Sequence, residues 1–365
     1  MPQHDYCKEA IMVNAHLWLD LLLSPHALKS AVSQWLADNP NSDPSAFVEQ
    51  QLERNHLIDV HTKQTGLVAW LGQSNQGFIP YPELPEQLRA INDPPIGLFY
   101  QGDQTLLSNT QLAIVGSRKP TPAGAENTIQ FAHQLTQAGL TLVSGLATGI
   151  DSLVHTTCLK AQGHTIAVLG QGLEHCYPKH NHALQQSIKE QGLLLSEYLP
   201  DCGVKAWQFP KRNRIISGLS EGVLITEAAQ RSGSLITAKL AAEQGRQVFA
   251  LPGDILNPMV TGCHHLIREG AQLVTHAEEI LEAIFWNQQH KLSLIPREAQ
   301  KHPLTKEENK VFKILDRTPT SIDKIQARTE CELTLVLDAL FSLELRGLII
   351  SSIDGYYKPT QGDTC

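Results

Sequence analysis

The sequence predicts an α/β protein: an extended Rossmann-like parallel sheet with a small N-terminal helical domain and a C-terminal winged-helix domain. Between residues 112 and 280, a short apolar run, a loop of small residues and an amphipathic stretch repeat in the same order. Runs this short suit strands covered on both faces, and the alternation implies right-handed crossovers. The expected strands are Leu112–Val115, Thr141–Val143, Thr165–Leu169, Leu193–Leu195, Gly222–Ile225 and Gln247–Leu251.

Glycines recur where each amphipathic stretch ends. A helix that stops and reverses commonly ends beside a residue in the left-handed conformation, which glycine adopts without strain. We therefore expect a positive φ at Gly139, Gly163, Gly192, Gly222, Gly245 and Gly270.

The composition narrows the class of protein. The chain has 365 residues, 42% of them hydrophobic, which suits about two or three domains with their own cores. Its seven cysteines are scattered and never spaced as Cys-x-x-Cys, which favours a reduced compartment over a disulfide framework or a zinc site. The chain begins without a basic, apolar leader and contains no apolar run of membrane-spanning length, so we expect a cytoplasmic protein with no membrane contact.

The domain organisation follows from changes in pattern along the chain. Residues 1–85 show apolar side chains at helical spacing and predict a small helical, SAM-like domain. The Pro-rich stretch from Phe78 to Pro95 is interpreted as the join to the Rossmann-like domain, expected at residues 86–290. A polar linker is expected at residues 291–303.

The last segment, residues 304–365, predicts a winged helix. Three short helical patterns precede two short strands around Asp354-Gly355. The third helix, which would enter the major groove of DNA, carries more carboxylates than cations, so a role in protein contact or packing is favoured over DNA reading. The expected helices are Thr305–Leu315, Ser321–Arg328 and Leu333–Arg346, and the charges of the third are Glu332, Asp338 and Glu344 against Arg346.

The distribution of charge matters more than the net charge of −8. A negative total disfavours nucleic acid when taken alone, because phosphate contacts need cations at the interface. However, Lys205, Lys211, Arg212 and Arg214 fall in one stretch with no acidic residue between them. This stretch predicts a basic patch on an acidic protein.

The loops after the strands are the candidate site, because ligands bind outside the carboxyl ends of a doubly wound sheet. The first loop begins Gly116-Ser117-Arg118, and its amides and the following helix N-terminus favour an anion. It matches neither the dinucleotide fingerprint nor the Walker A loop. We therefore expect a phosphate site without a dinucleotide cofactor.

The second loop begins at Ser144-Gly145, where a dinucleotide-binding fold would place an acid for the ribose. Asp151 and His155 follow it by a few residues. They could hold a ligand together, but we favour a helix cap for Asp151 and a packed side chain for His155.

The third and fourth loops carry rings and cations together. Gly170 and Gly172 precede Tyr177, Lys179 and Asn181, which suggests a phosphate contact beside a ring on which a base stacks. The fourth segment is the most informative, because planar guanidinium groups and aromatic faces are what unpaired bases and phosphates contact. Its candidate residues are Phe209, Lys211, Arg212, Asn213 and Arg214, with Trp207 beside them.

The fifth loop offers hydroxyls and amides. Ser232, Gly233 and Ser234 open a regular helix, with Ser232 or Ser234 expected as its N-cap. The neighbouring residues Cys263-His264-His265 have no companion cluster, so we predict no metal site there.

The motifs together resemble the DNA-processing protein A (DprA/Smf) family, over about Pro82 to Leu281. They combine several strand-end loops in a specific order. The matching residues are Gly116-Ser117-Arg118, Ser144-Gly145, Gly149-Ile150-Asp151, His155, Gly170-x-Gly172, Tyr177-Pro178, Asn181, Phe209 to Gly218, Glu227-Ala228, Ser232 to Thr237 and Pro252-Gly253.

The resemblance implies a homodimer of Rossmann domains that binds single-stranded DNA, protects incoming strands and loads the RecA recombinase in natural transformation and recombination. The sequence itself contains no recognisable nucleophile motif and no carboxylate pair placed for acid-base chemistry, so we expect binding without enzymatic turnover and without a cofactor. Glu174 and His265 depart from the family's usual Asp and Asn, but neither change removes a positive charge.

One alternative is an enzyme. The predicted core is also similar to nucleotide phosphoribohydrolases, which place a catalytic Glu at the start of a helix. In our alignment on Gly233-Ser234, Thr237 stands at that position, so the expected base is missing.

Overall fold

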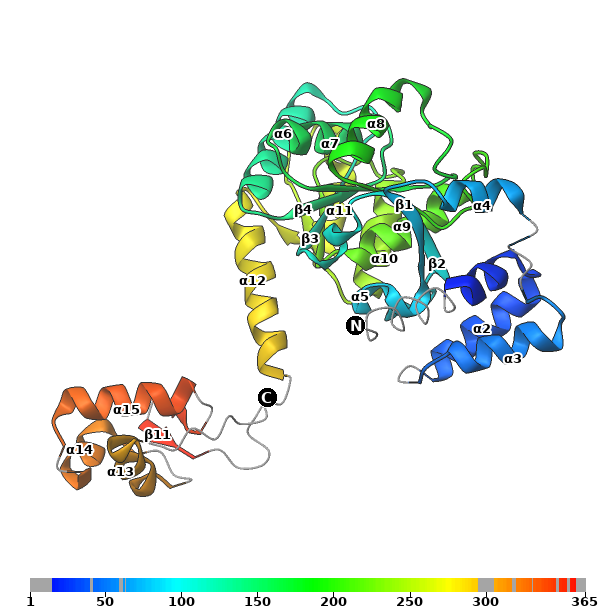
Figure 1. Ribbon diagram of the computed structural model, residues 1–365. Helices are drawn as coiled ribbons and strands as arrows, with labels where there is room; N and C mark the ends of the chain where they lie inside the picture. Colours follow the sequence, from blue (N-terminus) through cyan, green and yellow to red (C-terminus); the bar gives the residue numbers. More distant parts are fainter. Residues whose placement is uncertain are drawn as a thin grey trace. The chain divides into compact units, whose positions relative to one another are not determined.

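The computed structural model describes residues 15–39, 42–58, 62, 64–294, 305–316, 320–329, 331–345, 348–352 and 355–358. The chain divides into two compact units, Met1–Gln289 and His290–Cys365 (Figure 1). None of the helices within the described ranges combines the length and apolarity that crossing a bilayer requires.

The described residues of the first unit form a nine-stranded sheet in the order β1-β2-β6-β5-β4-β3-β7-β8-β9. From β6 to β9 all neighbours are parallel, whereas β1 and β2 pair antiparallel at one edge. The order β5-β4-β3-β7-β8-β9 is the Rossmann order, which reverses direction between β3 and β7. The strands are β1 Gln76–Pro80, β2 Gly97–Gly102, β3 Gln111–Val115, β4 Thr141–Ser144, β5 Thr165–Leu169, β6 Leu193–Ser196, β7 Gly222–Ile225, β8 Gln247–Ala250 and β9 Gln272–Leu273.

Helices cover both faces of this sheet, and strand residues alternate between them (Figure 1). Ile166 and Val168 face the side of α9 and α10, whereas Ala167 and Leu169 face the side of α8. Helices α6, α7 and α12 pack on that second side. The helices are α6 Pro122–Gln137, α7 Ile150–Lys160, α8 His182–Gln191, α9 Gln208–Leu219, α10 Ser234–Glu243, α11 Thr261–Arg268 and α12 Ala277–Leu294. The predicted fold class is confirmed.

The stretch interpreted as a join belongs instead to the sheet edge. It contains most of β1, the short helix α5 (Glu86–Arg89) and the approach to β2. Pro80 ends the outermost strand, where the missing amide hydrogen breaks no ladder. The prediction failed because prolines at an edge strand look the same in sequence as prolines in a linker.

The N-terminal helices pack on both sides of the sheet: those within residues 26–54 contribute to the core on the α9 side, whereas the helix at residues 65–71 contributes to the core on the α8 side. They comprise a helical segment at residues 15–23, followed by α2, α3 and α4. The ring of Trp18 stacks on that of Tyr81, with 5.4 Å between centroids. Trp18 also belongs to the same apolar core as Leu88 and Ile216, so this small domain is anchored on the Rossmann sheet. The bounds are α2 His26–Asp38, α3 Ser45–Arg54 and α4 Thr65–Leu71.

The glycine prediction was half right. Gly139, Gly245 and Gly270 have the expected positive φ, and the other three do not. At Gly192, for instance, φ is −147°. A Cβ there would lie 2.5 Å from the carbonyl oxygen of Thr165, so this glycine permits a close approach instead.

The described residues of the second unit form three helices and a two-stranded antiparallel hairpin, as expected of a winged helix. Thr305 opens the first helix with a capping box that includes Glu308. The linker predicted at 291–303 begins as helix, because α12 continues to Leu294, and the rest lies outside the described residues. The elements are α13 Lys306–Ile314, α14 Ile322–Thr329, α15 Leu333–Leu345, β10 Ile350–Ser352 and β11 Gly355–Tyr357.

Candidate nucleic-acid interface

The strand-end loops meet at one edge of the sheet. The amide of Ile150 donates to the carbonyl oxygen of Ser117 over 3.1 Å, which joins the loops after β3 and β4. The amide of Ser117 donates to the carbonyl oxygen of Glu227 over 2.8 Å, which adds the loop after β7. Segments far apart in sequence therefore share one rim, as the sequence predicted.

Arg212 lies at this edge but points inward. Its Nη1 donates to the carbonyl oxygen of Gly145 over 2.9 Å and to that of Val168. A Cβ on Gly145 would lie 2.5 Å from Nη2, so glycine makes room for the guanidinium. Burial lowers the pKa of Arg212 to about 10, which leaves the group positive at neutral pH.

Arg214 is also buried and already paired. Its Nε lies 2.8 Å from Oδ2 of Asp93, and its Nη2 lies 2.6 Å from Oε1 of Glu197. Burial alone would lower the pKa of Arg214, but Glu197 and Asp93 outweigh burial and raise it. The expectation that Arg212 and Arg214 present free forks to phosphates is therefore corrected: both guanidinium groups hold the protein together.

Asp151 and His155 are structural as well. Oδ2 of Asp151 accepts hydrogen bonds from the amides of Gly145 (3.2 Å) and Ala147 (3.3 Å), so it fixes the loop before α7 and caps no helix. Burial raises the pKa of Asp151, while Arg212 and these amides oppose the rise. His155 is fully buried, with Nδ1 2.7 Å from Oγ1 of Thr165, and burial lowers its pKa to about 3.

Glu227 closes the anion site that the first loop suggested. Its buried carboxylate accepts hydrogen bonds from the amide of Thr121, at 3.0 and 3.2 Å, and from the Thr121 hydroxyl. Thr121 is the N-cap of α6, so a carboxylate of the chain occupies the place where Rossmann folds bind a phosphate. Ser117 is also buried, and its Oγ accepts from the amide of Lys119. This role of Glu227 could not be predicted from local sequence, because its partner Thr121 lies 106 residues away.

Rings and cations remain exposed on the rim. The side chains of Arg118, Lys179 and Lys211 are exposed. Tyr177 is 46% exposed, and its ring centroid lies 5.4 Å from that of the half-buried Phe209. These five residues are the rim cluster.

Trp207 extends the rim cluster with a further ring. It is 57% exposed and meets Tyr198 edge to face at 5.9 Å. Exposure this high is unusual for a ring of this size, because an indole buried in the core would gain more from the hydrophobic effect. Trp207 is therefore a candidate stacking surface.

The remaining predicted residues divide into scaffold and surface. Gly170 accommodates the ring of Phe209, and Gly172 packs against the backbone of Leu199 and Pro200. Asn181 is buried and donates to the carbonyl oxygen of Leu146. Gly145 and Ser234 are buried, whereas Gly116, Asn213, Ser232 and Gly233 are partly or fully exposed.

The start of α10 differs from the expectation. Its N-cap is Gly233, which has no side chain to accept a hydrogen bond. The amide of Ser234 instead donates to Oγ of Ser232 over 3.3 Å, and the two hydroxyls lie 2.7 Å apart. Thr237, the residue at the catalytic position of the alternative enzyme, is buried on this helix.

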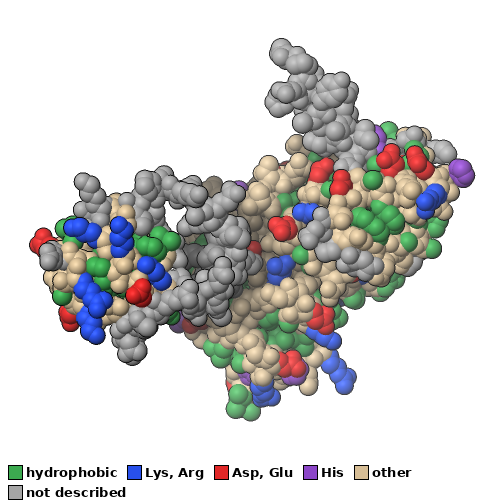
Figure 2. Space-filling model, turned by 90° about the horizontal axis from the view of Figure 1, so that it is seen from below, with side chains coloured by type: hydrophobic (Ala, Val, Ile, Leu, Met, Phe, Trp, Pro, Cys, Tyr) green, Lys and Arg blue, Asp and Glu red, His purple; other side chains and the backbone are tan. Residues whose placement is uncertain are grey.

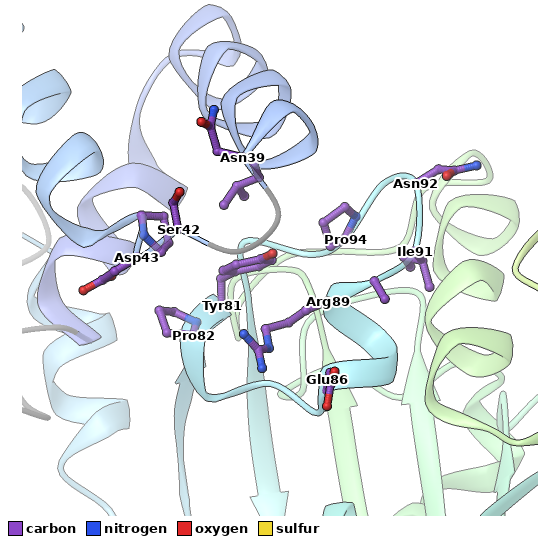
Figure 3. A pocket seen from close by; sticks show the side chains of 13 residues that line it. Asn39, Ser42, Asp43, Tyr81, Pro82, Glu86, Arg89, Ile91, Asn92 and Pro94 are labelled. Carbon is purple, nitrogen blue, oxygen red and sulfur yellow. The ribbon is translucent and has the colours of Figure 1, made fainter. Parts of the chain in front are cut away.

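A hollow of about 730 Å³ lies away from these loops, between the N-terminal helices and α5 (Figure 3). Tyr81 and Arg89 lie across its centre, and Nε of Arg89 donates to the carbonyl oxygen of Leu84. No strand-end residue described above lines it. Within the described ranges no cluster of His, Cys, Asp or Glu could hold a metal ion.

These features define a class: an α/β protein with Rossmann strand order, two extra antiparallel edge strands, an internally closed anion site and a winged-helix unit. A family model described as DNA recombination-mediator protein A matches residues 78–285, and one described as the DprA winged helix domain matches residues 295–355. The chain belongs to the DNA-processing protein A (DprA/Smf) family, which confirms the resemblance found in the sequence.

Relatives match over most of their length. The chain is 37% identical to Protein Smf of Escherichia coli, over 95% of this chain and 96% of that one. It is 48% identical to the DNA processing protein DprA of Streptococcus pneumoniae, over 66% and 82%. The X-ray structure of DprA from S. pneumoniae is similar with a TM-score of 0.58 and 35% identity, over 77% of this chain and 97% of that one. A Helicobacter pylori DprA structure, described as giving insight into its single-stranded DNA binding mode, has a TM-score of 0.54 and 31% identity, over 58% and 96%.

Proposed function

We propose that this chain binds single-stranded DNA without catalysing a reaction, protects incoming strands and loads RecA in natural transformation and recombination. The observation that supports this proposal is the rim cluster, in which exposed cations lie at the carboxyl edge of the sheet together with the exposed ring of Tyr177 and the half-buried ring of Phe209. Unpaired bases stack on rings while phosphates pair with cations, and the two requirements coincide only for a single strand.

The described DNA binding of the H. pylori relative supports this proposal. The closure of the α6 N-terminus by Glu227 also supports the proposal. A phosphate finds no free helix N-terminus there, so a DNA strand must contact exposed side chains instead. In this proposal Arg118, Lys179 and Lys211 contact phosphates. Arg212 and Arg214 act by holding the loops and α9 in place.

The primary experiment measures anisotropy of a labelled oligo-dT and of its duplex with oligo-dA across a salt series. We expect tighter binding of the single strand, with log K falling linearly with log salt, by about 0.7 per phosphate contacted. Equal affinity for the duplex would contradict the proposal, because paired bases cannot stack on the rim.

Two variants separate phosphate contact from stacking. Lys211→Met should weaken binding and flatten the salt slope by about 0.7–1. Trp207→Ala should cost about 1–3 kcal/mol of binding free energy and leave the slope unchanged. Lys160→Met is the matched control, because Lys160 is exposed in the last turn of α7, at the opposite edge of the sheet. If Lys160→Met weakened binding as much as Lys211→Met, the rim would not be the interface.

The remaining parts of the proposal have separate tests. Protection predicts slower exonuclease digestion of a labelled strand, and loading predicts faster RecA assembly on it, both lost in Lys211→Met. A homodimer through the Rossmann domain predicts the dimer mass in sedimentation equilibrium. Release of free base from nucleoside monophosphates would instead support the enzyme alternative.

A further inference from the structure

Helix α15 presents an apolar stripe to solvent. Leu333, Leu337 and Phe341 follow one another at a spacing of four residues, so they lie along one face of the helix. They are 43%, 41% and 65% exposed. The adjoining face is buried, with Val336, Leu340 and their neighbours forming the core of the unit. The stripe is therefore additional to what the fold of this unit requires.

The charges around the stripe have one sign. Between Cys331 and Leu345 the sequence contains Glu332, Asp338 and Glu344 and no Lys, Arg or His. Asp338 is exposed and lies three residues before Phe341, so the two side chains are neighbours on the helix surface. Arg346, which follows α15, lies outside the described residues; cations that the structure does describe in this unit include Lys310 and Lys313 on α13 and Lys324 and Arg328 on α14. Figure 2, seen from the side of α13 and α14, shows Lys and Arg outnumbering Asp and Glu on that face of the unit.

We propose that the stripe Leu333–Leu337–Phe341 of α15 is a docking surface for a protein segment with apolar side chains at helical spacing and Lys or Arg on its flanks. The apolar side chains of the partner would cover the stripe, and its cations would lie against Asp338 and its acidic neighbours. Apolar anchors at i and i+4 positions are the usual means by which a helix is recognised in a groove or along a face. The proposal goes beyond the DNA-binding function and is independent of it.

The same observations disfavour the two other occupants. A duplex would place phosphates against three carboxylates and offer few apolar groups for Leu337 and Phe341, which opposes the usual use of this helix in a winged helix. A second copy of α15 would bring acidic side chains against acidic ones. Charge complementarity therefore selects a basic partner over DNA or self-association.

The test uses the full-length protein and two labelled synthetic helical peptides. Both carry leucines at a spacing of four residues; one is flanked by lysines and the other by glutamates. We expect the lysine-flanked peptide to bind at least about tenfold tighter, and Phe341→Glu to weaken its binding by about tenfold or more. Leu335→Glu is the matched control, because Leu335 is 46% exposed on another side of the same helix and should not affect binding.

A charge-reversal variant distinguishes a lost contact from a misfolded protein. Asp338→Lys should weaken binding of the lysine-flanked peptide and strengthen binding of the glutamate-flanked peptide. A general loss of structure cannot produce both changes. The proposal is overturned if the two peptides bind equally or if Leu335→Glu acts like Phe341→Glu. It is also overturned if Phe341→Glu abolishes duplex binding or self-association by sedimentation, which would assign the stripe to DNA or to a second copy.

Discussion

Replacing Arg212 with methionine tests whether this arginine holds the site together or contacts DNA. The change removes the guanidinium and keeps an unbranched side chain. The carbonyl oxygens of Gly145 and Val168 lose their donor, and each buried acceptor left unpaired costs about 1–3 kcal/mol. Asp151 also loses a nearby positive charge. We expect Arg212→Met to lower the free energy of unfolding by about 3–5 kcal/mol, the range for a broken buried charge interaction.

The neighbouring Lys211 provides the contrast. Its side chain is exposed, so Lys211→Met should change the free energy of unfolding by less than about 0.5 kcal/mol while weakening DNA binding. Urea unfolding followed by tryptophan fluorescence measures the stability change. All five tryptophans lie in the unit Met1–Gln289, so this signal follows that unit alone.

The pH dependence of the Arg212→Met deficit adds a second check. Burial raises the pKa of Asp151 and Arg212 opposes the rise, so the variant should raise that pKa further. A carboxyl group whose folded pKa exceeds its unfolded pKa loses stability as pH rises between the two values. The free energy of unfolding lost in Arg212→Met should therefore be larger at about pH 8 than at about pH 5. Equal urea midpoints for Arg212→Met and the unchanged protein would refute the buried role of Arg212.

Two further predictions concern other buried groups of the site. Burial lowers the pKa of His155 from 6.5 to about 3, so the unfolded chain takes up a proton first as pH falls, and stability at about pH 5 should be about 2 kcal/mol lower than at neutral pH. His155→Gln should remove this contribution to the difference in urea midpoint between the two pH values. An unchanged difference in the variant would contradict the assignment. Glu227→Ala should cost about 1–3 kcal/mol and open the α6 N-terminus, so that inorganic phosphate raises the melting temperature of the variant only. The same phosphate effect in both proteins would show that Glu227 does not close this site.

The parallel strands could be predicted closely because they are covered on both faces. Such strands are continuous apolar runs, and β3 to β8 begin and end within one residue of the expected positions. Edge strands lack this signal. β1 pairs on one side only and ends at Pro80, so its pattern is indistinguishable from that of a connecting segment.

The residues of the site were found more easily than their roles. A run of cations in one segment is visible in the sequence, but whether a cation is exposed depends on partners far along the chain. Arg214 pairs with Asp93, 121 residues away, and Glu227 bonds Thr121, 106 residues away. Local charge patterns contain no information on such pairs, which explains why Arg212 and Arg214 were expected at the surface.

The closure of the α6 N-terminus also bears on which anion can bind. A helix N-terminus with free amides can hold one phosphate well, whereas an exposed cation in water contributes about 1 kcal/mol or less to a single ion pair. Glu227 occupies the N-terminus of α6, so the rim offers mainly exposed cations to an anion, in Arg118, Lys179 and Lys211. Weak contacts of this kind sum only along a ligand that presents several phosphates at once. This edge of the sheet is therefore suited to a polynucleotide and poorly suited to a mononucleotide.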